Sequence, residues 1–279
     1  MFKTRVISGA ILVVLISLMN LIGGPFMGVV LFFISVQGLY EFYRATGVFT
    51  EGGEEKHNAP EIIGYLGTAV YYFFIMMIKS NSLLKMLLIL CIVFVALLAV
   101  YVFYFPRYDG TLVMKAFFGF VYIPVMLGFI YSTRMMPCGK YLVWLIYIAS
   151  WICDTCAYLI GIKFGKHKLA PVLSPNKSIE GAVGGIAGTV VISILFSFIF
   201  MRAYELNGAV NVLQFCLIGF IGAIVSQVGD LAASAFKRNG DAKDYGVIIP
   251  GHGGVMDRFD SVIFTAPMIF FLTALFFGV

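Results

Sequence analysis

Apolar runs of about twenty residues follow one another along this whole sequence, and each is long enough to cross a bilayer as a helix. Hydrophobic residues make up 61% of the 279 residues and charged residues 12%, against about a quarter in soluble proteins. No stretch has the composition of a soluble domain. We therefore expect an all-α, polytopic integral membrane protein with nine spans, at 6–22, 24–43, 62–79, 83–105, 113–133, 141–161, 179–202, 211–235 and 260–278.

The spans predict one integral domain with two functional halves. Residues 1–140 are expected to form a transmembrane scaffold, and residues 141–279 the half that carries the chemistry. The first run, behind Lys3 and Arg5, is kept as a helix because "LMNLIGGPF" has no small-residue cleavage pattern of a signal peptide.

The cationic residues predict an orientation. With the N-terminus inside, 14 of the 19 Lys and Arg residues fall on one side of the membrane. Cytoplasmic loops carry the excess of Lys and Arg in membrane proteins. We therefore expect a cytoplasmic N-terminus and an external C-terminus. The net charge of +5 is therefore concentrated on one predicted side of the membrane. It could also give that side some affinity for anionic lipid headgroups.

Three acidic residues of the C-terminal half, Asp154, Glu180 and Asp230, lie within apolar runs or at their edges. A charge inside a bilayer costs about 2.5–3.5 kcal/mol on insertion scales, so such residues mark a polar cavity or an ion site. All three stand near the cytoplasmic ends of their predicted helices. We therefore expect them to converge on one layer near that surface.

The same half contains motifs that favour helix packing. In "EGAVGGIAG" (180–188), Gly181 with Gly185 and Gly184 with Gly188 have the GxxxG spacing that lets helix backbones approach closely. Cys153 and Cys156 form a CxxC pair inside a predicted span. Since a zinc site needs further ligands that this segment lacks, we interpret the cysteines as packing residues.

The longest polar stretch is "GDLAASAFKRNGDAKDYGVIIPGHGGVMDRFDS" (229–261), where Asp230 and Asp257 bracket a predicted loop. Carboxylates suit Mg²⁺, which takes one or two of them together with substrate phosphates. Glycine N–H groups can form an anion-binding nest. Cations match phosphate charge. The glycines are Gly251, Gly253 and Gly254, and the cations are Lys237, Arg238, Lys243 and Arg258. His252 is either a base or phosphate donor, or an isolated histidine with no direct role.

A second polar loop, "GIKFGKHKLAPVLSPNKSIEG", adds Ser174, Lys177 and Ser178 on the same predicted side. It could be no more than a basic cytoplasmic loop, but Ser178 is placed to cap the next helix. Neither GxxxxGK[ST] nor GxGxxG occurs, which disfavours a P-loop or Rossmann site. From the residues alone we expect a metal-assisted, phosphate-handling membrane enzyme, with a cation-coupled transporter as the rival.

Two blocks, 153–181 and 229–261, resemble the CDP-diacylglycerol synthase (phosphatidate cytidylyltransferase) family. The second matches the family pattern S-x(2)-K-R-x(4)-K-D-x(5)-P-G-H-G-G-x(2)-D-R-x-D from Ser234 to Asp260. Two departures stand out: Ala233 replaces a Glu found in many members, and Ser178 replaces a common Thr. The blocks cover about a fifth of the chain, while the N-terminal half is similar only in hydropathy and helix number.

The resemblance implies a reaction in which CTP and phosphatidate give CDP-diacylglycerol and pyrophosphate with Mg²⁺. By this resemblance Asp230 and Asp257 would hold the metal. A second metal ion, either divalent or monovalent, is left open. The phosphates would be bound or positioned by Lys237, Arg238, Lys243, His252 and Arg258, supported by Asp244 and Asp260. The pocket would also be lined by Asp154, Ser174, Lys177 and Ser178.

The expected partners are CTP, a phosphatidate lipid and the bilayer, without nucleic acid, and a homodimer is left open. The expected location is a bacterial cytoplasmic membrane, with the active site facing the cytoplasm. Two alternatives remain: another CTP-dependent lipid transferase or kinase that acts on a polyprenol or ether lipid, and the transporter. The transporter accounts poorly for the cations and "PGHGG" in one polar stretch, and no repeat symmetry is present.

Overall fold

The computed structural model of this chain describes residues 2–49, 57–77, 82–203, 212–240, 244–246, 248–249 and 253–277. Within these residues, eight helical runs are long and apolar enough to cross a membrane, and the first helix adds a shorter apolar segment, Ile7–Ile22. The all-α, polytopic fold is therefore confirmed. Six of these runs are single helices, α2 (Gly24–Thr46), α3 (Ala59–Met77), α4 (Ser82–Phe103), α10 (Ile179–Ala203), α11 (Val212–Asn239) and α12 (Met256–Phe277), while the shorter apolar segment belongs to α1 (Phe2–Ile22).

The two remaining spans are composite. Residues 110–135 comprise α5 (Gly110–Phe120), the π-helical turn η1 (Val121–Val125) and α6 (Met126–Met135). Pro124 lies within η1, where its missing N–H removes one helical hydrogen bond. Residues 139–164 comprise α7 (Gly139–Leu142), α8 (Trp144–Tyr147), the π-helical turn η2 (Ile148–Ile152) and α9 (Cys153–Phe164).

The polar stretch around residue 245 is shorter than predicted, because helices extend into it from both sides. Lys237 and Arg238 lie in the last turn of α11, and Asp257 lies in the first turn of α12, with Arg258 beside it. The prediction that these cations belong to a loop is wrong. Cations stabilise the negative end of a helix dipole and acids the positive end, so the polar residues extend these helices instead of ending them.

The chain forms two compact units. Unit 1 comprises residues 1–132 and 236–259, and unit 2 comprises residues 133–235 and 260–279. Because helices α6, α11 and α12 each contribute residues to both, these units differ from the halves predicted at residue 140. That functional division stays a prediction.

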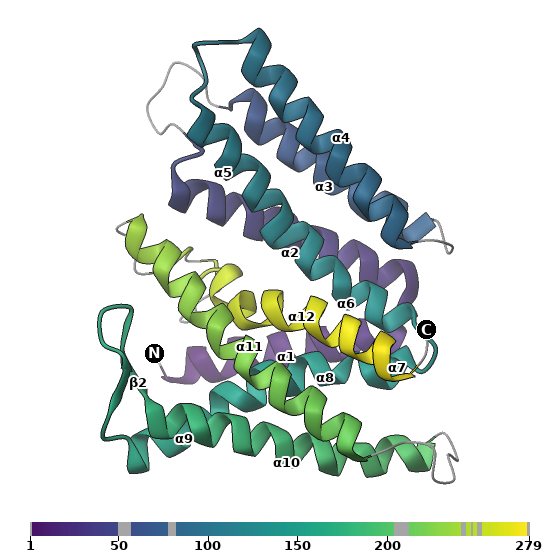
Figure 1. Cartoon of the computed structure of the whole chain (residues 1–279), viewed down its shortest axis with the longest axis vertical. Helices are drawn as coiled ribbons and strands as arrows, with labels where there is room; N and C mark the ends of the chain where they lie inside the picture. The colour runs from purple at the N-terminus through teal and green to yellow at the C-terminus, as the bar shows by residue number, and fades with distance from the viewer. Residues whose placement is uncertain are drawn as a thin grey trace. The chain divides into compact units, whose positions relative to one another are not determined.

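In unit 1, α2 packs with α3 and α5, and α3 lies beside α4 (Figure 1). Tyr43 of α2 is fully buried and donates from its hydroxyl to the carbonyl of Ala116 at 2.7 Å. A side chain at Gly64 or Gly119 would collide with the Tyr43 ring. The two glycines therefore let a large aromatic residue join three helices.

In unit 2, α9 and α10 form the most extensive helix pair. A Cβ atom at Gly181 would lie 2.7 Å from the Ala157 carbonyl oxygen, and one at Gly185 would lie 2.9 Å from that of Cys153. At Gly188 it would meet Cys156. The packing role predicted for the GxxxG glycines and for the two cysteines is confirmed.

Unit 2 also contains a short antiparallel hairpin that the sequence analysis did not predict. Strand β1 (Lys168–Ala170) pairs with β2 (Ser174–Ser178), with Lys168 opposite Ser178 and Ala170 opposite Ser174. The predicted basic loop is therefore an ordered structure that leads directly into α10.

Candidate functional site

Asp257 is the centre of a hydrogen-bond cluster in unit 1. Its Oδ2 accepts the backbone N–H groups of Tyr245 and Gly254, each at 2.9 Å, and its Oδ1 accepts from Lys237 Nζ at 2.8 Å. The Asp257 side chain is 4% exposed, so this pair is well shielded from water. The ammonium of Lys237 also lies 5.4 Å from the centre of the Tyr245 ring. The structure thus joins two residues, 237 and 257, that the family pattern places in one motif.

Gly253 and Gly254 let the backbone lie close to two carboxylates, those of Asp257 and Glu41. Gly253 has φ +85°, a left-handed conformation that favours glycine. Any side chain there would also press on Asp257, since a Cβ would lie 2.8 Å from its Oδ2. A Cβ at Gly254 would instead collide with the carboxylate of Glu41. Gly253 and Gly254, for which a phosphate-binding role was predicted, thus lie directly against acidic side chains, and that role stays a prediction.

Glu41 is a residue that the sequence analysis missed. It lies in the apolar helix α2 and is only 1% exposed. Its two oxygens accept the backbone N–H groups of Val255 at 3.0 Å and Met256 at 2.9 Å, at the start of α12. A third bond comes from Gln37 Nε2 at 3.1 Å. An acid within the apolar run 24–43 is the same signal that identified Asp154, and it could have revealed Glu41.

The structure describes some of the other predicted site residues of this region and leaves three of them out. Asp244 is exposed and Arg258 is half-buried. Arg238 is exposed at the end of α11. Asp260 belongs to unit 2, where its Oδ1 accepts the Ser261 N–H at 2.8 Å. Lys243, Gly251 and His252 lie outside the described residues.

Unit 2 contains a pocket of about 620 Å³ that brings both sequence blocks together. Asp154 comes from α9, Ser174, Lys177 and Ser178 from the hairpin, and Asp230 from α11. Lys177 Nζ and Asp230 Oδ2 form an ion pair, although 53 residues separate them. Asp154 Oδ2 accepts from the Ser261 hydroxyl at 3.3 Å. The predicted meeting of Asp154 and Asp230 in one polar cavity is confirmed.

Glu180 lies in the first turn of α10, at the end of the helix where it was expected, but outside the unit 2 pocket. It is not among the described residues that line the pocket, and instead it holds the base of the hairpin. Its carboxylate accepts the backbone N–H groups of Lys166 and His167 and approaches His167 Nδ1 to 2.6 Å. Ser178 Oγ accepts the Gly181 N–H at 3.1 Å, which confirms the predicted cap. These contacts fix the hairpin segment at residues 166–167 and at Ser178. Lys177 lies between these two positions in the sequence and is positioned by them.

The pocket in unit 2 has the donor atoms that a hard cation prefers. Asp154 and Asp230 line it together with Ser174, Asn176 and Gln227, whose side chains carry hydroxyl or amide oxygens. Across the described residues, no three His, Cys, Asp or Glu side chains gather into a metal cluster. A metal here would therefore complete its coordination with substrate phosphates and water, as Mg²⁺ commonly does. Asp230 and Asp257 belong to different units, so their joint binding of a metal stays a prediction.

In the described part of the chain, eight spanning runs and a carboxylate–lysine pair in each unit define a polytopic α-helical membrane protein with ionic sites that are partly or fully buried. Ionisable residues of this kind in membrane proteins mark candidate functional sites. The chain belongs to the cytidylyltransferase family, whose family model matches residues 3–276.

Individual relatives cover a smaller part. A protein of Staphylococcus haemolyticus (strain JCSC1435) is 40% identical over 145 residues, which is 52% of this chain and 54% of that protein. A protein of Staphylococcus aureus (strain COL) is 38% identical over 148 residues, 53% of this chain and 54% of that protein. Both bear the name phosphatidate cytidylyltransferase. The chain thus matches about half the length of these curated relatives.

Proposed function

We propose that this chain is a phosphatidate cytidylyltransferase, which converts CTP and phosphatidate to CDP-diacylglycerol and pyrophosphate. The observation that carries the proposal is the Lys177–Asp230 pair in the unit 2 pocket, because it joins the two motif blocks of a cytidylyltransferase family member. The named relatives support the choice of substrates.

The main obstacle to this reaction is repulsion between two phosphates. A phosphatidate oxygen attacks the α-phosphorus of CTP, a new P–O bond forms, and the bond to the leaving pyrophosphate breaks. Charge neutralisation and positioning are what a protein supplies to such a transfer. Lys177 and Lys237 are each paired with a carboxylate, that of Asp230 and that of Asp257. We propose that incoming phosphates compete for these ammonium groups, which then bind and orient them.

We propose Mg²⁺ as the cofactor, held by Asp230 with Asp154 in the unit 2 pocket and by Asp257. When bound, Mg²⁺ would neutralise phosphate charge. The Tyr245 and Gly254 N–H groups keep the Asp257 carboxylate oriented. Ser174 and Ser178 offer hydroxyls that can donate to phosphate oxygens in the same pocket as Lys177.

A lipid substrate explains why the enzyme is embedded in a membrane. Its acyl chains remain in the bilayer while its headgroup meets CTP at the surface. The excess of cations on one predicted side supports an active site that faces the cytoplasm, and the staphylococcal relatives support a bacterial cytoplasmic membrane. Association into a homodimer stays a prediction.

The test uses the purified full chain with phosphatidate micelles, Mg²⁺ and CTP labelled separately at the α- or γ-phosphorus. We expect the α-label in a lipid-soluble nucleotide, the γ-label in pyrophosphate, and loss of both products with EDTA. Transfer of the γ-label to lipid would instead identify a lipid kinase. Asp230→Asn protein that inserts and folds normally should be inactive, and undiminished turnover would remove this pocket from the reaction.

A further inference from the structure

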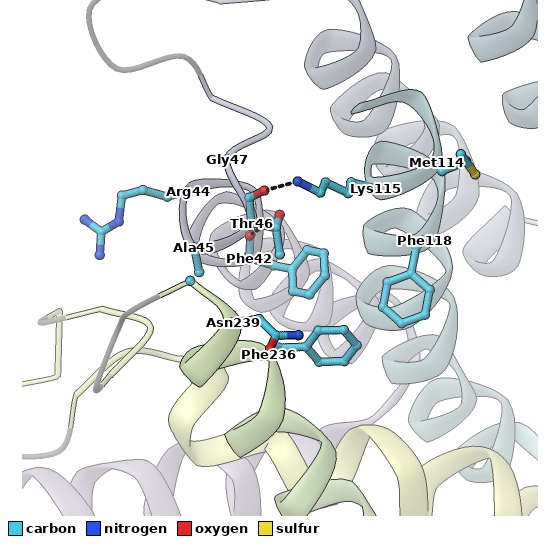
Figure 2. Close-up of a pocket in the computed structure, with 11 residues that line it drawn as sticks. Phe42, Arg44, Ala45, Thr46, Gly47, Met114, Lys115, Phe118, Phe236 and Asn239 are labelled. Atoms are coloured by element: carbon cyan, nitrogen blue, oxygen red, sulfur yellow. Dashed lines mark hydrogen bonds between the residues drawn. The ribbon is translucent and has the colours of Figure 1, made fainter. Parts of the chain in front are cut away.

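Unit 1 contains a pocket of about 670 Å³ that the proposed reaction does not use (Figure 2). It lies where two helices end and a third begins: α2 at Thr46, α11 at Asn239 and α5 from Gly110. The ends of spanning helices lie where the headgroups of a bilayer meet its hydrocarbon core. The pocket is therefore at the depth at which a lipid presents both its charge and the first carbons of its chains.

One wall of the pocket is aromatic. The ring centres of Phe42, Phe118 and Phe236 are 5.4–5.8 Å apart, and Figure 2 shows these side chains around the same space. Phe118 is 43% exposed and Met114, one turn away on α5, is 66% exposed. Since both lie on a helix that can span the membrane, this wall is accessible to acyl chains.

The charged side chains that line the pocket in the described part of the chain are both cations, Arg44 and Lys115. Lys115 Nζ donates to the Thr46 carbonyl at 2.9 Å and has two further N–H donors. The Arg44 guanidinium donates to the Tyr245 carbonyl at 2.8 Å and points away from the rings in Figure 2. Lys115 is thus the cation best placed for a ligand, and Arg44 adds positive potential nearby.

The two ends of α2 and α11 are held together by a close backbone contact. A Cβ at Gly240 would collide with the carbonyl oxygen of Ala45. Both residues line the pocket, so its polar edge is formed by backbone that cannot separate without losing this contact. The pocket is consequently a feature of the packed fold of unit 1.

We propose that this pocket binds an anionic phospholipid, with the phosphate at Lys115 and an acyl chain against Phe118 and Phe236. Basic pockets between spanning helices on the cytoplasmic side suit anionic headgroups. A zwitterionic lipid would bring its own cation to Lys115 and gain less. A soluble phosphate would leave the aromatic wall unused. The pocket shares no residue with the unit 2 pocket, so this inference stands independently of the proposed reaction.

The test is photo-crosslinking in phosphatidylcholine vesicles that contain the full chain and a phosphatidylglycerol probe with a diazirine in its acyl chain. Phosphatidylglycerol is anionic without being the proposed substrate, so failure here and failure of the cytidylyltransferase proposal are distinguishable. We expect labelling on peptides with residues 111–118 and 236–240. Added phosphatidylglycerol should compete, whereas phosphatidylcholine and soluble glycerol 3-phosphate should not.

The matched variants are Lys115→Gln and Lys163→Gln. Both replace an exposed lysine of a spanning run with the same neutral side chain, but Lys163 lines neither pocket. One basic residue near an anionic surface contributes about 1 kcal/mol, so Lys115→Gln should reduce labelling about fivefold and Lys163→Gln should leave it unchanged.

Equal loss of labelling in both variants, or competition by phosphatidylcholine as strong as that by phosphatidylglycerol, would overturn the proposal. Competition by glycerol 3-phosphate would show a soluble phosphate site instead. The competition series uses the wild-type chain, so it decides the matter even where a variant does not fold.

Discussion

Glu41 shows how a single residue can organise a motif that lies more than 200 positions away in the sequence. Together with Asp257 it accepts four backbone N–H groups, those of Tyr245, Gly254, Val255 and Met256. Two of these donors open α12, where the helix dipole favours a negative charge. In the described part of the chain no cation pairs with Glu41, so these hydrogen bonds compensate its buried charge.

Glu41→Gln should therefore disturb the motif that carries Asp257. The amide keeps one accepting oxygen but turns an NH₂ group toward a backbone N–H donor. Losing a hydrogen bond to a charged group costs about 1.5–3 kcal/mol. We expect a lower unfolding temperature and a turnover reduced about tenfold or more, measured on purified protein. Gln37→Leu, which removes the hydrogen bond that Glu41 accepts from within α2, should have a clearly smaller effect, and equal effects would contradict a positioning role.

Asp257→Asn tests the acid itself. The substitution keeps the shape of the side chain but leaves Lys237 without its counter-charge and weakens any metal bound there. We expect CDP-diacylglycerol formation to fall by more than about a hundredfold while membrane insertion is retained. Asp109→Asn makes the same change at an exposed carboxylate and should alter turnover less than about twofold. A fully active Asp257→Asn protein would exclude the acid from the reaction.

At the scale of elements, the α9–α10 pair supports the unit 2 pocket. Asp154 is carried by α9, and α10 begins directly after Lys177 and Ser178 of the hairpin. The hairpin is held by Glu180 from the first turn of α10. The distance between these two helices therefore controls how the pocket residues face one another.

Gly185→Leu should separate these helices. A Cβ at this position would lie 2.9 Å from the Cys153 carbonyl oxygen, which is backbone and cannot move aside as a side chain could. Overpacking of this kind costs about 1–3 kcal/mol. We expect a lower unfolding temperature in detergent and reduced turnover. Val183→Leu adds bulk on the same helix at a residue that is 61% exposed, and it should leave both quantities near wild type.

At the scale of the whole molecule, the number of spans decides on which side each terminus lies. Among the residues that the structure describes, eight helical runs have the required length and apolarity, and α1 contributes the shorter segment Ile7–Ile22. If α1 also spans, the total is odd and the termini lie on opposite sides. The bias of Lys and Arg then predicts a cytoplasmic N-terminus.

A reporter fused to the C-terminus tests this topology. We expect alkaline phosphatase, which is active only outside the cytoplasm, to be active there, and green fluorescent protein at the same position to be dark when exported in unfolded form. Deleting residues 2–22 should reverse both signals. Unchanged signals after the deletion would show that α1 does not cross the membrane.

The sequence by itself determined the membrane class, the family and, to within a few residues, the bounds of the eight spanning runs in the described part of the chain. It could do so because hydrocarbon excludes polar groups along every span, and a fixed motif keeps its spacing in any fold. The tertiary structure alone decided that Lys177 pairs with Asp230, that Glu180 anchors a hairpin and that Glu41 holds the start of α12. These partners are far apart in the chain, and hydrophobic patterning carries no information on which buried charge meets which donor.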